Sequence, residues 1–415
     1  MNTLHNCSTV PSNTSNAYNL NSNNGNINND NKTNDNNNGA RCVRSEKDTI
    51  FGFEKIYFAY EACRKRKRNT RNTLKFEQEL EKNLFELHSS LNNRCYEPKR
   101  SVCFVVLKPK PREIFAADFR DRIVHHVLVN ELEKIFEKRF VFDSYACRKG
   151  KGTHKAVKRL KKFMQSYQIS SKNKKRAYFL QLDVQNFFMS IDKKILFNLI
   201  EKRVLASKDF SLFQKEELLY LSKKIIFSLS QKDFVKNSCE KMWKTVPKHK
   251  SLFNAGEKRG LPIGNYSSQF FANVYLHELD FYVKNVLRCK HYVRYVDDFI
   301  LLSDSKEQLL GWFWEIKDFL KNDLLLNLNS RVILLPLSNG IDFLGYIIRP
   351  WSIYVRKRVI INFKKKIVEY NKLVVSGDLD DFDKKHFCST KASYFGHFKH
   401  ANCFRIKKEL LDNIA

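Results

Sequence analysis

The chain has 415 residues, 43% of them hydrophobic, which is enough for two or more packed subdomains. Its net charge of +31, from 75 Lys and Arg against 44 Asp and Glu, favours a nucleic-acid partner over an anionic membrane surface. No apolar run reaches transmembrane length, no signal-peptide layout opens the chain, and the ten cysteines lack the C-x-x-C spacing of zinc ribbons. We therefore expect a cytoplasmic protein with reduced thiols and no membrane partner.

The chain opens on an Asn-rich tract, residues 1–45, with few large apolar residues. Such a segment cannot bury enough surface to offset its ordering entropy, so we expect it to be disordered. From Phe51 to Leu91 apolar residues recur at helical spacing, and the basic run Arg64–Arg68 lies within this region. The run either contacts phosphates, which we favour, or forms a solvated helix end.

A basic hairpin is predicted next. Val102–Leu107 reads as a strand, prolines interrupt it, and Glu113–Phe115 resumes as a second strand. Lys110 and Arg112 flank the turn, and cations at such a tip can contact the phosphates of a nucleotide. An ordinary exposed turn is the alternative.

Residues 118–140 carry the periodicity of an amphipathic helix. A basic turn with two glycines, Arg148 to Gly152, then precedes a helix that opens at Thr153. Arg148 and Lys151 in this turn suit a contact with a nucleic-acid backbone, although isolated glycines are a weak motif.

A carboxylate follows the next strand. Ala177–Leu182 is an apolar strand that ends in Asp183, and Phe188 lies five residues further on. An Asp at the end of a buried strand, followed by a bulky ring, suits a site for metal and sugar together. A capping or turn Asp is the alternative. The lysine-rich, partly helical segment 205–258 has no chemistry that its pattern predicts.

A loop rich in Gly, Pro and Ser, residues 260–269, opens the following helix. Gly264 lets the backbone approach a ligand, and Ser268 and Gln269 offer hydrogen bonds near the helix N-terminus.

An adjacent pair of carboxylates, Asp297 and Asp298, organises the chain. β-branched and aromatic residues flank the pair, which predicts two short strands joined at a tight turn. Buried carboxylates repel one another unless a cation shares them, so the pair alone indicates either a metal site or a solvated Asp-Asp turn between surface strands. With Asp183 the pair forms the acidic cluster (Asp183, Asp297 and Asp298), of the kind that two-metal phosphoryl transfer needs.

The remainder predicts a helix over residues 306–322, strands around the turn Ser338–Gly340, and basic helices over the last sixty residues. Such basic helices are suited to gripping the backbone of a duplex.

Six blocks, in this order, resemble those of the reverse transcriptases. They are LKPKPREIFAADFRDR and SYACRKGKGTH in the fingers, LDVQNFFMSID, GLPIGNYSSQ and YVDD in the palm, and FLGY at the primer grip. The resemblance covers roughly residues 55–410, and six ordered blocks are highly specific.

The resemblance implies an α+β right-hand polymerase with fingers, a palm built on an antiparallel sheet, and a helical thumb. We expect N-terminal helices and fingers over 46–176, a palm over 177–350 that includes an insertion at 205–258, and a thumb over 351–415.

The resemblance also implies roles for single residues. Asp183, Asp297 and Asp298 would be catalytic and metal-binding. The incoming nucleotide would meet Lys110, Arg112, Phe188, Ile263, Gly264 and Gln269, with Phe188 as the steric gate against a 2′-hydroxyl. Template and primer would meet Arg148, Lys151, Ser268, Phe343, Leu344 and Gly345. The family usually has a Lys before the primer grip, where this chain has Arg331 and Val332, so proton donation to pyrophosphate by that route is in doubt.

Within the family the chain looks most like the reverse transcriptases of diversity-generating retroelements. Bacterial relatives usually carry Gln-Gly and then Ser-Pro in the second palm block, where this chain has Ile263-Gly264 and Ser268-Gln269. The closing block, residues 394–405, is similar to that branch too. Replacing a hydrogen-bonding Gln by Ile relaxes discrimination by about 1–3 kcal/mol, which suits an error-prone polymerase.

The implied cofactors are two Mg²⁺ ions, with Mn²⁺ as an alternative. The implied partners are a template RNA, a DNA or RNA primer, dNTPs and a basic accessory protein.

Two other functions stay open: a reverse transcriptase of a group II intron or of antiphage defence, and a catalytically silent RNA-binding scaffold. The short C-terminus disfavours the intron type, and the three retained aspartates disfavour the scaffold.

Overall fold

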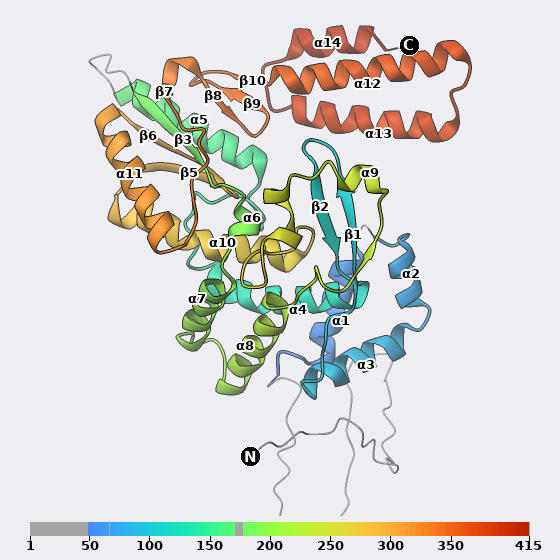
Figure 1. Ribbon diagram of the computed structural model, residues 1–415. Coiled ribbons are helices and arrows are strands. Elements are labelled where there is room, and N and C mark those ends of the chain that lie inside the picture. The colour runs from blue at the N-terminus through green and yellow to red at the C-terminus, as the bar shows by residue number, and fades with distance from the viewer. Residues whose placement is uncertain (1–48, 66, 171–176, 415) are drawn as a thin grey trace, which may run out of the picture.

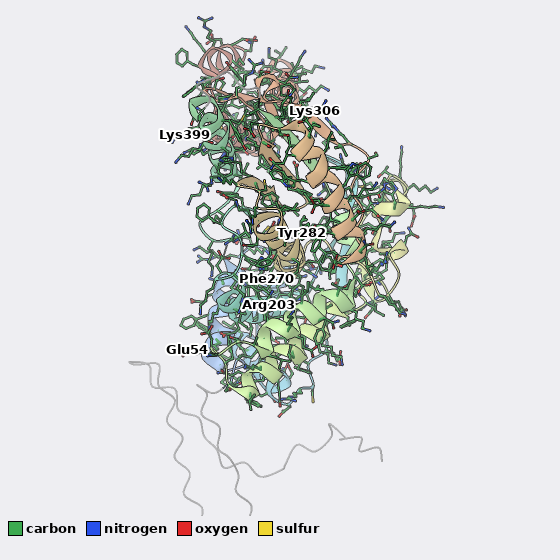
Figure 2. The ribbon with its side chains drawn as sticks, turned by 90° about the vertical axis from the view of Figure 1, so that its left-hand side faces the viewer. Glu54, Arg203, Phe270, Tyr282, Lys306 and Lys399 are labelled. Carbon is green, nitrogen blue, oxygen red and sulfur yellow. The ribbon has the colours of Figure 1, made fainter. Side chains whose placement is uncertain are left out.

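The computed structural model describes residues 49–65, 67–170 and 177–414. The Asn-rich tract predicted to be disordered lies outside the described residues. Within them, three units follow one another along the molecule, as Figure 1 shows: N-terminal helices, a central region with the sheets, and a C-terminal helical bundle. In Figure 2, Phe270 lies in the central region, between Glu54 near one end and Lys399 near the other.

The N-terminal region forms separate short helices rather than one continuous helix. They are α1 (Phe53–Arg64), α2 (Arg71–Glu77) and α3 (Leu80–Asn92). They pack against α4 (Phe119–Phe136), whose buried face has the apolar period that the sequence predicted. Of the basic run, Arg64 is the last residue of α1, Lys67 and Arg68 lie before the start of α2, and Arg66 lies outside the described residues.

The predicted basic hairpin is present as β1 (Ser101–Val106) and β2 (Arg112–Ala116), paired antiparallel. A third strand, β4 (Phe234–Lys236), extends this sheet on the other side of β1 in parallel orientation. β4 belongs to the segment 205–258, which the sequence assigned to the palm as an insertion. Part of that segment therefore completes the sheet of the hairpin.

The central sheet has the strand order β5-β6-β3-β7, and every pairing in it is antiparallel. Its strands are β5 (His291–Tyr295), β6 (Asp298–Ser303), β3 (Tyr178–Asp183) and β7 (Ile333–Pro336). One face packs against α10 (Tyr266–Phe281) and α11 (Lys306–Asn322), and the other packs against α5 (Thr153–Ser170). This arrangement confirms the predicted α+β class with an antiparallel palm sheet.

Helices and short turns connect these strands. They are α6 (Phe187–Ser190), α7 (Lys193–Leu205), α8 (Leu212–Ile226), α9 (Glu240–Trp243), the 3-10 turns η2 (Lys248–Lys250), η3 (Leu252–Asn254) and η5 (Leu337–Asn339), and the π-helical η4 (Tyr282–Val286). The predicted turn at Ser338–Gly340 does not join a pair of partnered strands, because β7 pairs with β3 while β8 (Ile341–Phe343) pairs with β9 (Tyr346–Ile348).

The C-terminal bundle has its own apolar core and consists of α12 (Lys357–Ser376), α13 (Asp381–Phe398) and α14 (Phe404–Asp412). β10 (Ile353–Val355) pairs with β9, so residues that the sequence placed at the start of the thumb join the sheet of the primer grip. The tip of the β1–β2 hairpin points toward the bundle (Figure 1). The pKa of Glu369 on α12 is lowered mainly by the hydrogen bond from Lys366, and the charge of Lys108 at the hairpin tip adds a smaller contribution. No helix in the described ranges is long and apolar enough to cross a membrane.

Candidate active site

The central sheet brings the acidic cluster together at one of its ends. Asp183 is the last residue of β3 and pairs in register with Asp298, the first residue of β6. β5 and β6 are joined by a two-residue turn, Val296-Asp297, because Tyr295 pairs with Asp298. The backbone N–H of Val184 donates to the carbonyl of Asp297 at 3.3 Å, which ties the turn to the end of β3. The predicted hairpin and the predicted third carboxylate therefore meet.

Burial and mutual repulsion make these carboxylic acids weak. Burial raises the pKa of Asp297 to about 6, and the charge of Asp183 adds to the rise. Burial raises the pKa of Asp298 to about 7, with contributions from the other two members of the cluster, although a hydrogen bond from Gln181 opposes the rise. Burial also raises the pKa of Asp183. A bound cation would relieve both effects, because it offsets lost solvation and like-charge repulsion.

Two amide side chains that the sequence analysis did not single out orient the cluster. Gln181 donates from Nε2 to Asp298 Oδ1 at 3.0 Å, and Asn329 donates from Nδ2 to Asp183 Oδ2 at 3.2 Å. The backbone N–H of Asn329 also donates to the carbonyl of Asp183 at 2.8 Å. Gln181 precedes Asp183 by two residues and so shares its face of the strand, a signal that the sequence does contain. Asn329 lies in the connection between α11 and β7, and no local sequence pattern indicates its contact with Asp183.

The donor set suits a hard divalent cation with water and substrate oxygens completing its coordination. Among the described residues no group of three or more His, Cys, Asp or Glu side chains is arranged to hold a metal ion by itself. Mg²⁺ is usually bound by one or two carboxylates together with waters and substrate phosphates, rather than by an all-protein cage. The carboxylates of the acidic cluster fit that role, with one oxygen of Asp183 accepting from Asn329 and one of Asp298 accepting from Gln181.

Cations from two distant segments act on the cluster. Burial raises the pKa of Asp183, and the charges of Lys110 and of Lys250 in η2 oppose this rise. Burial likewise raises the pKa of Asp297, and the charge of Arg112 opposes the rise, so both hairpin cations act on the acidic end of the palm sheet. Lys250 belongs to the segment 205–258, to which the sequence analysis gave no chemistry.

The loop before α10 is hydrogen-bonded both to the backbone of Phe188 and to the β1–β2 hairpin. The N–H of Leu261 donates to the carbonyl of Phe188 at 2.8 Å, and the N–H of Phe115 in β2 donates to the carbonyl of Ile263 at 2.8 Å. A Cβ on Gly264 would lie 2.7 Å from the carbonyl oxygen of Phe115, and its φ is +125°. Glycine is therefore required here by close packing on β2, which is a different reason from the approach to a ligand that the sequence suggested.

The neighbouring residues of α10 face in different directions. Gln269 is exposed, whereas Ser268 is only 2% exposed and lines a pocket of about 220 Å³ that Asp121 and His125 also line. Gln269 is thus open to a ligand on the helix surface, whereas Ser268 faces this pocket.

The basic turn before α5 has protein partners. The guanidinium of Arg148 donates to the carboxylate of Glu137 and to the carbonyls of Val141 and Ser144, with its side chain 5% exposed. Lys151 donates to the carbonyl of Phe142 at 2.8 Å and lies over the ring of the same residue. The donors of Arg148 have protein acceptors, of which the carboxylate of Glu137 is exposed, and the contact of Arg148 with nucleic acid stays a prediction.

The predicted primer grip is a tight turn between β8 and β9. Phe343 is buried in the core at 1% exposure, and Leu344 and Gly345 have φ of +53° and +87°. A Cβ on Gly345 would lie 3.1 Å from the ring of His397, so the turn packs against α13 of the bundle. The elements that the sequence assigned to the primer grip and the thumb are therefore in direct contact.

The chain belongs to the reverse transcriptase (RNA-dependent DNA polymerase) family, whose pattern residues 98–348 match. The match includes the whole acidic cluster, the hairpin and the primer-grip turn. With the antiparallel palm sheet and the acidic cluster at its end, family membership identifies the fold as that of a right-hand polymerase.

Two proteins from distant organisms are similar in sequence. Protein YkfC of Escherichia coli (strain K12) is 23% identical over 301 residues, which cover 63% of this chain and 70% of YkfC. Nuclear intron maturase 1, mitochondrial, of Arabidopsis thaliana is 22% identical over 343 residues, which cover 65% of this chain and 47% of the maturase. The chain thus spans about half the length of the maturase.

Among solved structures, telomerase from Candida albicans in complex with a fragment of telomeric RNA aligns with a TM-score of 0.46 and 12% identity, covering 68% of this chain and 54% of the telomerase chain. Apo telomerase from Candida tropicalis, truncated from its C-terminal domain, aligns with a TM-score of 0.45 and 12% identity, covering 64% and 58% of the two chains.

Proposed function

We propose that this member of the reverse transcriptase family copies a template RNA into cDNA by nucleotidyl transfer at the acidic cluster. The observation that carries the proposal is the meeting of Asp183 with the Val296-Asp297 turn, beside the cations of the β1–β2 hairpin. Its proposed partners are the template RNA, a DNA or RNA primer and dNTPs. Their phosphates suit a chain with a net charge of +31.

The proposed cofactors are two Mg²⁺ ions, or Mn²⁺ in their place, held by Asp183 and Asp297 with Asp298 nearby. When bound, they would supply activation of the 3′-hydroxyl and neutralisation of the pyrophosphate leaving group. The raised pKa values support this proposal, because buried carboxylates that resist ionisation gain most from a cation.

The protein's own groups would orient the substrates. Lys110 and Arg112 would pair with the triphosphate, and Phe188 would exclude nucleotides with a 2′-hydroxyl. Asn329 and Gln181 would hold the carboxylates of Asp183 and Asp298 in place through their hydrogen bonds.

We further propose that synthesis is error-prone, as in a diversity-generating retroelement, with a basic accessory protein as an additional partner. Ile263 supports this proposal, because an apolar side chain beside the nucleotide offers shape without a hydrogen bond to test the base. A group II intron-type enzyme is the second candidate, and the similarity to an intron maturase over 65% of the chain favours it.

Primer extension on an RNA template with Mg²⁺ tests these proposals. Wild type should extend the primer, Asp297→Ala/Asp298→Ala should lose extension, and sequencing of the cDNA should find errors concentrated at one template base. Uniform, low error would leave the polymerase but contradict the diversity-generating assignment. Failure of the wild type, even with native RNA and accessory protein added, would contradict polymerase activity.

A further inference from the structure

A buried arginine lies directly behind the turn of the acidic cluster. Arg294, in β5, is 0% exposed, and its guanidinium has a protein acceptor for each of its five N–H groups. Nε and one N–H of Nη2 donate to the two carboxylate oxygens of Asp280, at 2.7 and 2.6 Å. The other acceptors are Ser144 Oγ at 3.0 Å, Asn273 Oδ1 at 3.3 Å and the carbonyl oxygen of Val296 at 2.8 Å.

The bond to Val296 links this network to the cluster. Val296 is the first residue of the two-residue turn and has a φ of +57°, in the left-handed region that β-branched residues avoid. Such a conformation persists only where the surroundings impose it. The bond from Arg294 Nη1 holds the Val296 carbonyl, and Asp297 is the next residue.

The other end of the network is rigid. Asp280 and Asn273 both lie on α10, a 16-residue helix with most of its side chains buried. The backbone N–H of Arg294 also donates to the carbonyl of Asp143, and its carbonyl accepts from the N–H of Tyr145, both at 3.0 Å. Arg294 therefore connects the strained turn to a buried helix and to the loop before α5.

We propose that Arg294 is a positioning residue, which fixes the Val296-Asp297 turn through the Val296 carbonyl so that the Asp297 carboxylate is presented in a single orientation. The expected loss of kcat rests on the proposed polymerase function. The expected effect on the conformation of the Val296-Asp297 turn does not. A purely structural ion pair would stabilise the fold without affecting the turn specifically, and that difference can be measured.

The test compares Arg294→Lys with Tyr292→Phe. A lysine ammonium is a point charge and cannot reach Asp280 with two parallel bonds while also donating to Val296. Tyr292→Phe is the matched control, because the Tyr292 hydroxyl donates to the same Asp280 at 2.7 Å from an equally buried position but does not contact the turn. Both variants weaken one buried network, and only the first releases the turn.

Two readouts are measured for each folded variant: amide hydrogen exchange of the peptide that spans residues 292–299, and single-nucleotide incorporation. In Arg294→Lys we expect faster exchange in this peptide and a fall of kcat by about ten- to a hundredfold, with KM for the dNTP within about threefold, since small misplacements of a reacting group cost about 10² in rate. Tyr292→Phe should lower the melting temperature while keeping kcat within about twofold of wild type.

Unchanged exchange in this peptide, or equal kcat losses in the two variants, would overturn the proposal. If Arg294→Lys does not fold, Asp280→Asn takes its place, because it keeps Arg294 and the side-chain volume but removes the charge that orients the guanidinium. It should shift both readouts in the same direction by smaller amounts, and unchanged readouts would again overturn the proposal. An inactive wild type would contradict the proposed function, while the exchange measurement would still decide the role of Arg294.

Discussion

The three carboxylates of the acidic cluster share a sheet end but have different partners. Asp183 accepts hydrogen bonds from Asn329, Asp298 accepts one from Gln181, and Asp297 lies in the strained turn next to Val296. All three have raised pKa values, and burial is the largest cause in each case. At pH values below these raised pKa values the carboxyl groups carry protons, and a bound cation would displace them and leave negatively charged carboxylates.

This balance predicts a pH-dependent need for metal. The pKa values of Asp297 and Asp298 are raised to about 6 and about 7, so protons compete with a divalent ion below pH 7. The Mg²⁺ concentration for half-maximal primer extension should rise as the pH is lowered from about 8 to about 6. Magnesium titrations of primer extension at several pH values measure this concentration. The same concentration at about pH 6 and about pH 8 would contradict the raised pKa values of Asp297 and Asp298.

The same shifts predict the sign of a stability effect without metal. A carboxyl whose folded-state pKa is raised contributes stability below its unfolded pKa of about 4, and that contribution is lost as the pH rises through the folded value. The cluster should therefore make the metal-free protein progressively less stable between about pH 4 and pH 7. Asp298→Asn should flatten this part of the profile in denaturant unfolding.

A third prediction at the residue scale concerns Gly264. A Cβ there would lie 2.7 Å from the carbonyl oxygen of Phe115, so Gly264→Ala must shift the loop or β2. We expect a loss of about 1–3 kcal/mol in the free energy of unfolding, with a raised KM for the dNTP. Gly256→Ala is the control, because Gly256 also has a positive φ (+76°) but nothing within 4 Å of the added Cβ. Equal losses in the two variants would show that backbone conformation, rather than the clash, decides the cost.

At the scale of elements, three segments meet around one tyrosine of the primer grip. The hydroxyl of Tyr346 in β9 donates to the carbonyl of His397 in α13 at 2.9 Å and lies 3.3 Å from Nδ1 of His154 in α5. The rings of Tyr346 and His397 stack at 4.1 Å, and those of His154 and His400 at 3.6 Å. This contact connects the bundle to the palm through aromatic surfaces.

We expect His397→Ala to loosen this contact. Removing the ring deletes the stacking on Tyr346 and leaves a gap beside Gly345, so the bundle should hold the duplex less firmly and product length per binding event should fall severalfold. His386→Ala is the control, since His386 lies exposed on the same helix. Extension reactions with a trap for released enzyme measure the effect, and equal product lengths from both variants would argue against a role for the contact.

At the scale of the whole molecule, long-range pairing decides how the units are joined. β4, from the lysine-rich segment 205–258, pairs with β1, and β10, from the start of the predicted thumb, pairs with β9. The same segment contributes Lys250 to the surroundings of Asp183. Local periodicity cannot reveal the partner of β4, because this strand has only three residues and β1 lies far away in the chain. β10 is equally short, but its partner β9 precedes it closely in the chain.

The sequence by itself determined the strand ends that carry Asp183, Asp297 and Asp298, the basic hairpin, and the membership suggested by six ordered blocks, because these depend on local composition and spacing. Only the tertiary structure decided that Gln181 donates across the sheet to Asp298, that Asn329 donates to Asp183, and that Arg294 donates to the Val296 carbonyl. It also showed that the Arg148 guanidinium has protein acceptors and that Gly264 packs closely on β2. Hydrogen bonds and steric contacts between distant segments depend on the folded geometry, which no local pattern encodes.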